Sequence, residues 1–234
     1  MKNDDNYLNK YDLTKIKKVV LLNGYHLDYY YKYTKYFLNS INNLEELKIC
    51  NCNNGIINEI IIPQSVKIIE ISGENIIKIP ENIINLSNLE KLIITDCYYL
   101  QEIPNNLINL KKLEIINCNK IKKIPNLINL QNLYLEENYN IQEIPYTLIN
   151  LISLNIYYCK IKEIPDTLIN LNELIIMYCN NIQYIPFYIH LQNLEINHCK
   201  KLSSVKLNNC NDILLFFDCM NNPYKKYEIL FNQE

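Results

Sequence analysis

The most reactive side chains in this sequence belong to nine cysteines and three histidines. Thiols and imidazoles can bind zinc, form disulfides or act together as a nucleophile and its base. The histidines are His26, His190 and His198, and of these only His198 stands beside a cysteine, Cys199. Each chemistry needs its own geometry between side chains, so the elements that position the cysteines decide among them.

The cysteines follow an internal repeat of the sequence. The repeat reads Leu-x-x-Leu-x-Ile-x-x-Cys and returns every 20 or 21 residues. Its clear copies begin at Leu89, Leu110, Leu130, Leu151, Leu171 and Leu191, and weaker copies begin at Ile16, Leu44, Val66 and Asn211. An Ile-Pro pair recurs in phase with it, from Ile79-Pro80 to Ile185-Pro186. Self-similarity at this period predicts a solenoid of roughly nine or ten stacked coils.

The spacing within each repeat predicts a short strand. Apolar residues two apart, such as Leu92 and Ile94, lie on the same face of a strand, and the residues between them face outward. Stacked coils then form a parallel sheet with strands about 4.8 Å apart. The return half of each coil begins with Ile-Pro, and proline restricts its own backbone and that of the residue before it. About ten residues remain for this half, so we expect extended or 3-10 backbone rather than an α-helix.

This repeat resembles the leucine-rich repeat. The resemblance implies an α/β-type repeat solenoid, a horseshoe with a parallel β-sheet on its concave face and a mostly extended or 3-10 convex side. In that family the repeat position held here by the cysteine is Asn or Cys and points inward where the chain turns off the strand, so that its polar group satisfies buried backbone groups. The resemblance therefore assigns a structural role to one column of residues: Cys52, Cys97, Cys118, Asn138, Cys159, Cys179, Cys199 and Cys219.

Stacking in a column argues against all three thiol chemistries. Neighbouring strands bring cysteine Cα atoms within disulfide range, but parallel Cα–Cβ bonds oppose the S–S bond. A single file of thiols cannot supply four tetrahedral zinc ligands. His198 and Cys199 are adjacent, so their side chains should point to opposite sides of the chain. We expect reduced structural thiols and no metal, cofactor or catalytic site. Cys50 and Cys210 lie outside the column and are the thiols expected to be exposed.

The outward residues of the strands offer a different kind of function. Leucine-rich repeats typically bind partners on the concave face, so the resemblance predicts a partner site where apolar and aromatic outward residues gather. Exposed clusters that contain tyrosine are typical of interfaces, and a partner of basic and apolar character would fit. The predicted site lies over neighbouring coils and includes two acidic residues: Tyr134, Tyr157, Tyr158, Ile175, Met177, Tyr178, Glu114 and Glu136.

Codon use gives another explanation for these tyrosines. The sequence has no Ala, Arg or Trp and is rich in Ile, Asn, Lys and Tyr, which indicates an AT-rich genome such as that of a large DNA virus or a protist. Tyrosine also favours strands and covers pleated surfaces well. The sequence alone leaves both explanations of the cluster open.

Charge and composition limit the class of function. The formal net charge is -2 and arginine is absent, whereas binding to nucleic-acid backbones needs a basic surface. The first residues, Met1 to Asn6, lack the apolar core of a signal peptide, and the longest apolar run, Ile213 to Phe217, is too short for a membrane span. We expect a monomeric protein of the cytoplasm, or of the host cytoplasm if the genome is viral. It should bind a protein partner, but neither nucleic acid nor membrane.

The two ends of the chain depart from the repeat. Residues 1–43 are predicted to be an N-terminal cap with an amphipathic helix over 27–41, residues 44–206 the solenoid, and residues 207–234 a degenerate last repeat and C-terminal cap. In the last copy Leu214 and Phe216 take the inward strand positions, and Lys206 replaces the expected proline. In an early copy Glu74 takes the cysteine position.

These features predict a non-enzymatic scaffold that binds a protein partner through the concave face of the repeat array. The alternative is an adaptor or regulatory subunit that brings targets to an enzyme supplied in trans, such as a ubiquitin ligase or a phosphatase. An N-terminal docking module resembling an F-box would favour the alternative, although the Leu-Pro opening of that module is missing.

Overall fold

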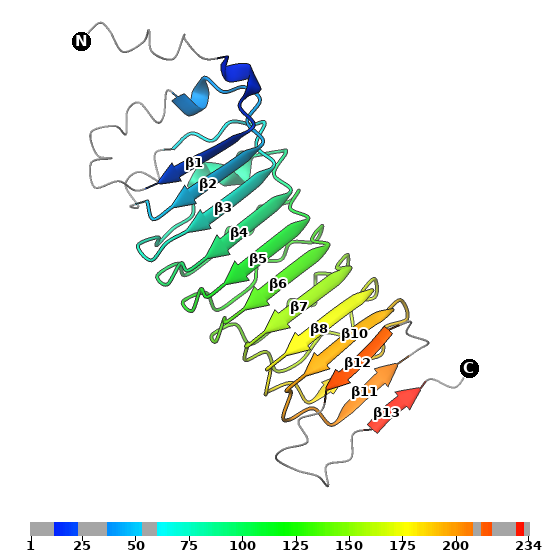
Figure 1. Cartoon of the computed structure of the whole chain (residues 1–234). Coiled ribbons are helices and arrows are strands. Elements are labelled where there is room, and N and C mark those ends of the chain that lie inside the picture. Colours follow the sequence, from blue (N-terminus) through cyan, green and yellow to red (C-terminus); the bar gives the residue numbers. More distant parts are fainter. Residues whose placement is uncertain (1–11, 23–36, 53–59, 208–211, 217–227, 232–234) are drawn as a thin grey trace, which may run out of the picture.

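The computed structural model describes residues 12–22, 37–52, 60–207, 212–216 and 228–231, and in this part of the chain the strands stack into a parallel β-solenoid (Figure 1). Ten strands form one sheet in the order β1-β2-β3-β4-β5-β6-β7-β8-β10-β12, and each neighbouring pair is parallel. Their bounds are Lys18–Leu22, Glu46–Cys50, Ile68–Ser72, Lys91–Thr95, Lys112–Ile116, Asn132–Glu136, Ser153–Tyr157, Glu173–Met177, Asn193–Asn197 and Asp212–Phe216.

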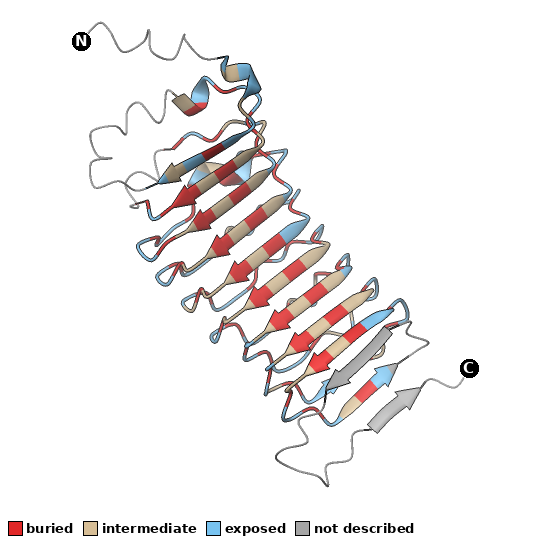
Figure 2. Cartoon of the chain, viewed as in Figure 1, coloured by how far each residue is buried: buried red, intermediate tan, exposed pale blue. Residues whose placement is uncertain are grey.

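Alternation of burial along each strand produces this stack. In β6, Leu133 and Leu135 are buried while Asn132, Tyr134 and Glu136 are half-buried, and the same pattern recurs from strand to strand (Figure 2). Each inward leucine pairs with its equivalent in the next coil, as Leu133 does with Leu113 and Leu154. The predicted strand positions and the predicted inward residues are therefore confirmed in β1 to β8 and in β10.

The return half of each coil is mostly turns and extended backbone. Among the described residues, the helical segments are the 3-10 helices η1 (Leu13–Lys15) and η2 (Glu81–Asn85) and a short stretch at 37–39. The parallel solenoid fits the leucine-rich-repeat resemblance, but its helix content is very low, so the α/β class is not confirmed. Coils of 20 or 21 residues leave too little chain for an α-helix between two turns.

A second, smaller parallel sheet forms on the return side near the C-terminal end, and the sequence analysis did not predict it. It contains β9 (Tyr184–Ile185), β11 (Ser204–Leu207) and β13 (Glu228–Phe231), in the order β13-β11-β9. Ile185 pairs with Val205, and β9 ends there because the next residue is Pro186, which has no N–H for a ladder. Lys206 stands in the proline position and has an N–H, so β11 continues and pairs with β13.

The register of the last strand in the main sheet corrects the sequence alignment by one residue. Leu214 was predicted to take an inward position, but it pairs with Glu195, and Ile213 pairs with Leu194. The paired residues Glu173 and Asn193 are 20 positions apart, whereas Asn193 and its partner Asp212 are 19 apart. A slip of one residue moves a whole strand by one pairing position, so the predicted alignment of this copy with the preceding strand is wrong by one residue.

Two further expectations about single residues are wrong. Glu74 is exposed rather than inward, because its coil leaves the strand through Gly73, which has a φ of 134°. A Cβ at Gly73 would lie 2.7 Å from Cα and 2.8 Å from the backbone N of Asn51, so this turn requires glycine. Cys50, expected to be exposed, is buried at the end of β2, where it pairs with Leu22 and Ser72 on the two neighbouring strands.

The predicted helix over 27–41 falls mostly outside the described residues. Its last part is helical at 37–39, and Leu38 and Ile41 are fully buried against the core. The capping roles of residues 1–43 and 207–234 remain predictions. Among the described residues, no helix is long and apolar enough to cross a membrane.

Candidate functional site

The predicted partner residues lie together on the outer face of the sheet. Strand register places Tyr134 of β6, Tyr157 of β7, and Ile175 and Met177 of β8 on outward positions of neighbouring strands. The rings of Tyr134 and Tyr157 are 5.3 Å apart between centroids and tilted by 35°. Tyr158 follows β7 and extends the cluster beyond the strand ends. The cluster therefore covers the outer face over β6–β8 and its carboxyl-terminal edge.

A stack of three rings runs along that edge. Tyr158 and Tyr178 stack with centroids 4.5 Å apart and an interplanar angle of 4°, and Tyr178 and His198 stack at 4.5 Å and 16°. His198 was not predicted as a site residue. Its position in the repeat, immediately before the inward cysteine like Tyr158 and Tyr178, could have identified it.

The stacked residues all have left-handed backbone. Their φ angles are 53° at Tyr158, 57° at Tyr178 and 52° at His198. Earlier coils fill the same position with residues that tolerate this conformation, such as Asn51, Asp96 and Asn117. A bulky side chain with a positive φ is uncommon and costs roughly 1–2 kcal/mol. Ring stacking, at about 0.5–1.5 kcal/mol per pair, offsets part of that cost.

Two phenols of the cluster, those of Tyr134 and Tyr157, have raised pKa values. Burial raises the pKa of Tyr134, and its hydrogen bond to Glu136 raises it further. The Tyr134 hydroxyl donates to Oε2 of Glu136 at 2.7 Å. Burial also raises the pKa of Tyr157, followed by the nearby carboxylates of Glu195, Glu136 and Glu173. Both phenols can therefore donate hydrogen bonds at neutral pH.

The two predicted acidic residues have different environments. The carboxylate of Glu114 forms an ion pair with the Lys91 ammonium at 2.5 Å. Glu136 accepts the Tyr134 hydroxyl, and no ion pair to it occurs within the described residues. The charge of Glu114 is thus compensated by a lysine, whereas the carboxylate of Glu136 has only a hydroxyl donor among the described residues.

The cysteine column lies inside the solenoid. All of its described cysteines are buried free thiols, and Cys219 falls outside the described residues. Most of these thiols bridge two backbone carbonyls: Cys179 Sγ, for example, donates to the carbonyl of Met177 at 3.3 Å and to that of Ile156 in the coil before at 3.6 Å. Burial raises the pKa of Cys52, Cys159 and Cys199 to about 11, which keeps these thiols protonated and unreactive.

Asn138 occupies the column position in its own coil and is fully buried. Its Nδ2 donates to the carbonyls of Ile115 at 2.7 Å and Glu136 at 2.9 Å. Its Oδ1 accepts the backbone N–H of Cys118 at 3.0 Å. The amide therefore satisfies three backbone groups at the strand exit.

His198 and Cys199 are directed to different neighbours. The imidazole stacks on Tyr178, while the Cys199 thiol donates to the carbonyls of Asn197 at 3.5 Å and Ile176 at 3.8 Å. In the described part of the chain, no group of three or more His, Cys, Asp or Glu side chains is placed to hold a metal ion.

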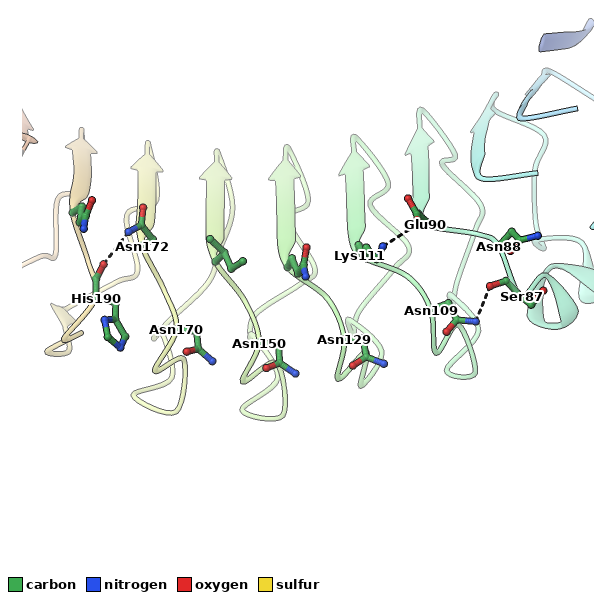
Figure 3. A pocket seen from close by; sticks show the side chains of 13 residues that line it. Ser87, Asn88, Glu90, Asn109, Lys111, Asn129, Asn150, Asn170, Asn172 and His190 are labelled. Atoms are coloured by element: carbon green, nitrogen blue, oxygen red, sulfur yellow. Dashed lines mark hydrogen bonds and ion pairs between the residues drawn. The ribbon is translucent and has the colours of Figure 1, made fainter. Parts of the chain in front are cut away.

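A shallow polar groove of about 770 Å³ crosses the other edge of the sheet, where the chain enters the strands (Figure 3). An asparagine ladder lines it, in which each amide donates to a carbonyl of the previous coil at 2.8–2.9 Å. These bonds hold neighbouring coils together, and His190 takes the next position after the ladder. Its members are Asn88, Asn109, Asn129, Asn150 and Asn170.

No protein-family model and no curated protein matches the sequence. Among solved structures, the leucine-rich repeat domain of the type III effector XCV3220 (XopL) is similar, with 15% sequence identity and a TM-score of 0.48. The similarity covers 94% of this chain and 78% of that domain.

Proposed function

We propose that this chain is a leucine-rich-repeat protein that acts as a non-enzymatic scaffold and binds a protein partner through the outer face of its sheet. The tyrosine–histidine stack carries the proposal. Tyr158, Tyr178 and His198 occupy a left-handed turn position that the local backbone does not favour for them. Residues that oppose their local backbone preference are expected at functional sites.

The stack also bears on the codon explanation of the tyrosines. Asparagine codons are as AT-rich as tyrosine codons, and asparagine fits left-handed backbone better. The first half of the solenoid has asparagine at this position in Asn51 and Asn117. Codon use therefore does not account for tyrosine at both Tyr158 and Tyr178, whereas a binding role does. Tyrosine is enriched among the residues that dominate binding energy.

Capture of partners from the native cells, followed by mass spectrometry, tests the proposal. We compare the wild-type chain with the double variant Tyr157→Ala and Tyr178→Ala, which removes two rings from the outer face. Two hot-spot tyrosines contribute about 2 kcal/mol each, so we expect binding to weaken by roughly a thousandfold. A matched double variant, Tyr146→Ala and Tyr184→Ala, removes two exposed tyrosines from the return half and should keep the partner.

Equal recovery of the same partner by wild type and the Tyr157/Tyr178 variant would overturn the outer-face site. The same capture separates the scaffold from the adaptor alternative. Ubiquitin-ligase or phosphatase subunits recovered at stoichiometric levels would favour an adaptor that acts for an enzyme supplied in trans. For the place of action we propose the cytoplasm, or the host cytoplasm if the source is a virus.

A further inference from the structure

The ion pairs of the described residues all lie in the first half of the solenoid, between residues 12 and 114. On the outer face, Lys18 pairs with Glu46 at 2.8 Å, Lys48 pairs with Glu70, and the last pair joins Lys91 of β4 to Glu114 of β5. Beyond β5 the outer face continues without such a pair in the described part of the chain.

The second half of the face carries uncompensated negative charge. On β2–β5 and the residue after each strand, Lys48, Lys91 and Lys112 face Glu46, Glu70, Asp96 and Glu114, a balance of three positive and four negative charges. The equivalent outward positions on β6, β7, β8 and β10 hold four carboxylates and no lysine. These are Glu136, Glu137, Glu173 and Glu195.

These carboxylates surround the tyrosines. Glu136 accepts the hydroxyl of Tyr134 at 2.7 Å, and Glu173 accepts the hydroxyl of Ser153 at 2.7 Å. Burial raises the pKa of Tyr157 most, and these two carboxylates together with Glu195 raise it further. A partner side chain bound at Tyr157 would contact aromatic rings and lie close to negatively charged carboxylates.

We propose that the outer face over β6–β10 binds an arginine-containing cationic peptide segment of the partner. The inference rests on the proposed function and names the chemistry of what binds. A guanidinium stacks on aromatic rings, is weakly hydrated and pairs with carboxylates through two parallel hydrogen bonds. The apolar Ile175 and Met177 at the centre of the patch accept the aliphatic stem of such a side chain.

The dimensions of the patch suit a short segment. It spans three strand spacings, about 14 Å, which an extended segment of about four residues covers. Nucleic acid is disfavoured because its phosphates would face the four carboxylates.

Panning of a random peptide library against the purified full-length chain tests the inference. We expect the enriched peptides to contain arginine well above the starting library. Binding of a fluorescently labelled enriched peptide should weaken by at least about tenfold in the double variant Glu136→Gln and Glu195→Gln, because each removes a charge-assisted contact. It should also weaken as salt increases, since exposed charge pairs are screened.

A matched double variant distinguishes a local binding site from a general effect of net charge on affinity. Glu46→Gln with Glu70→Gln changes the net charge by the same two units, but in the first half of the face, and should leave affinity unchanged. Equal weakening in both double variants would overturn a site over β6–β10.

Enriched peptides that lose binding in the Tyr157→Ala and Tyr178→Ala variant but lack arginine would overturn the arginine-containing segment and leave the proposed face intact. If neither these peptides nor native partners depend on those tyrosines, the proposed function fails as well.

Discussion

The side-chain oxygen of Asn138 accepts a hydrogen bond from the backbone N–H of Cys118, one coil earlier, at 3.0 Å. In the other described coils with this column a thiol fills the position and donates to carbonyls, but sulfur is a weak acceptor. Asn138 therefore links two coils through a bond that its cysteine equivalents make poorly.

Replacing Asn138 should destabilise the solenoid more than replacing a cysteine of the same column. Asn138→Ala leaves the buried backbone N–H of Cys118 without its acceptor, at about 1–3 kcal/mol, and removes a donor from the carbonyls of Ile115 and Glu136. Asn138→Cys should cost less, because a thiol can still donate its one S–H to the carbonyl of Ile115 or Glu136. Free energies of unfolding from urea titrations check the order. A loss for Asn138→Ala no larger than that for Cys179→Ala would contradict it.

The assignment of inward and outward residues along the strands gives a second prediction. Leu133 is buried between coils on both sides, so Leu133→Ala should lower the free energy of unfolding by about 2–5 kcal/mol. Its outward neighbour Asn132 serves as the control, and Asn132→Ala should change stability by less than about 0.5 kcal/mol. Similar losses for the two variants in denaturant titrations would show that the phase is misassigned.

The sequence was sufficient to predict most of the fold, because each coil repeats the same pattern of buried residues. Leu92, Leu113 and Leu133 pair in the main sheet as their spacing requires. The prediction failed where the period changed. The 19-residue step from Asn193 to Asp212 shifted the last register, and replacement of proline by Lys206 allowed a second sheet.

The candidate site was harder to predict than the fold. The outward tyrosines could be placed from alternation alone, but the left-handed turn at Tyr158 and Tyr178 could not, because neither residue favours it. The ring stack and the inclusion of His198 depend on that turn. The pairing of Glu114 with Lys91 also needed the structure, since the two residues lie on different strands.

The left-handed backbone at Glu137 gives a third prediction. Glu137 has a φ of 54°, the described part of the chain gives it no ring contact, and asparagine tolerates this conformation better. Glu137→Asn should therefore raise the free energy of unfolding by about 1 kcal/mol. The control is Glu143→Asn, the same substitution at an exposed residue without positive φ, which should be close to neutral. No gain for Glu137→Asn over this control would mean that the turn is not strained.

The buried thiols predict a loss of stability at alkaline pH. Burial raises the pKa of Cys159 from its ordinary value of 9.0 to about 11. The folded state therefore holds the thiol proton more tightly than the unfolded state. The stability that this provides is fully present below pH 9 and is lost as pH rises from 9 toward 11, at up to about 1.4 kcal/mol per pH unit for one thiol.

Urea titrations at about pH 8 and about pH 10.5 measure this loss. Lysines and tyrosines also titrate in this range, so the comparison is with Cys159→Ala, which keeps those groups and lacks the thiol. The wild-type chain should lose more free energy of unfolding than the variant between the two pH values, by about 1–2 kcal/mol. Parallel losses in the two proteins would show that the Cys159 thiol titrates normally in the folded state. The column would then be open to solvent, and its thiols should react with a thiol reagent as fast in the folded chain as in urea.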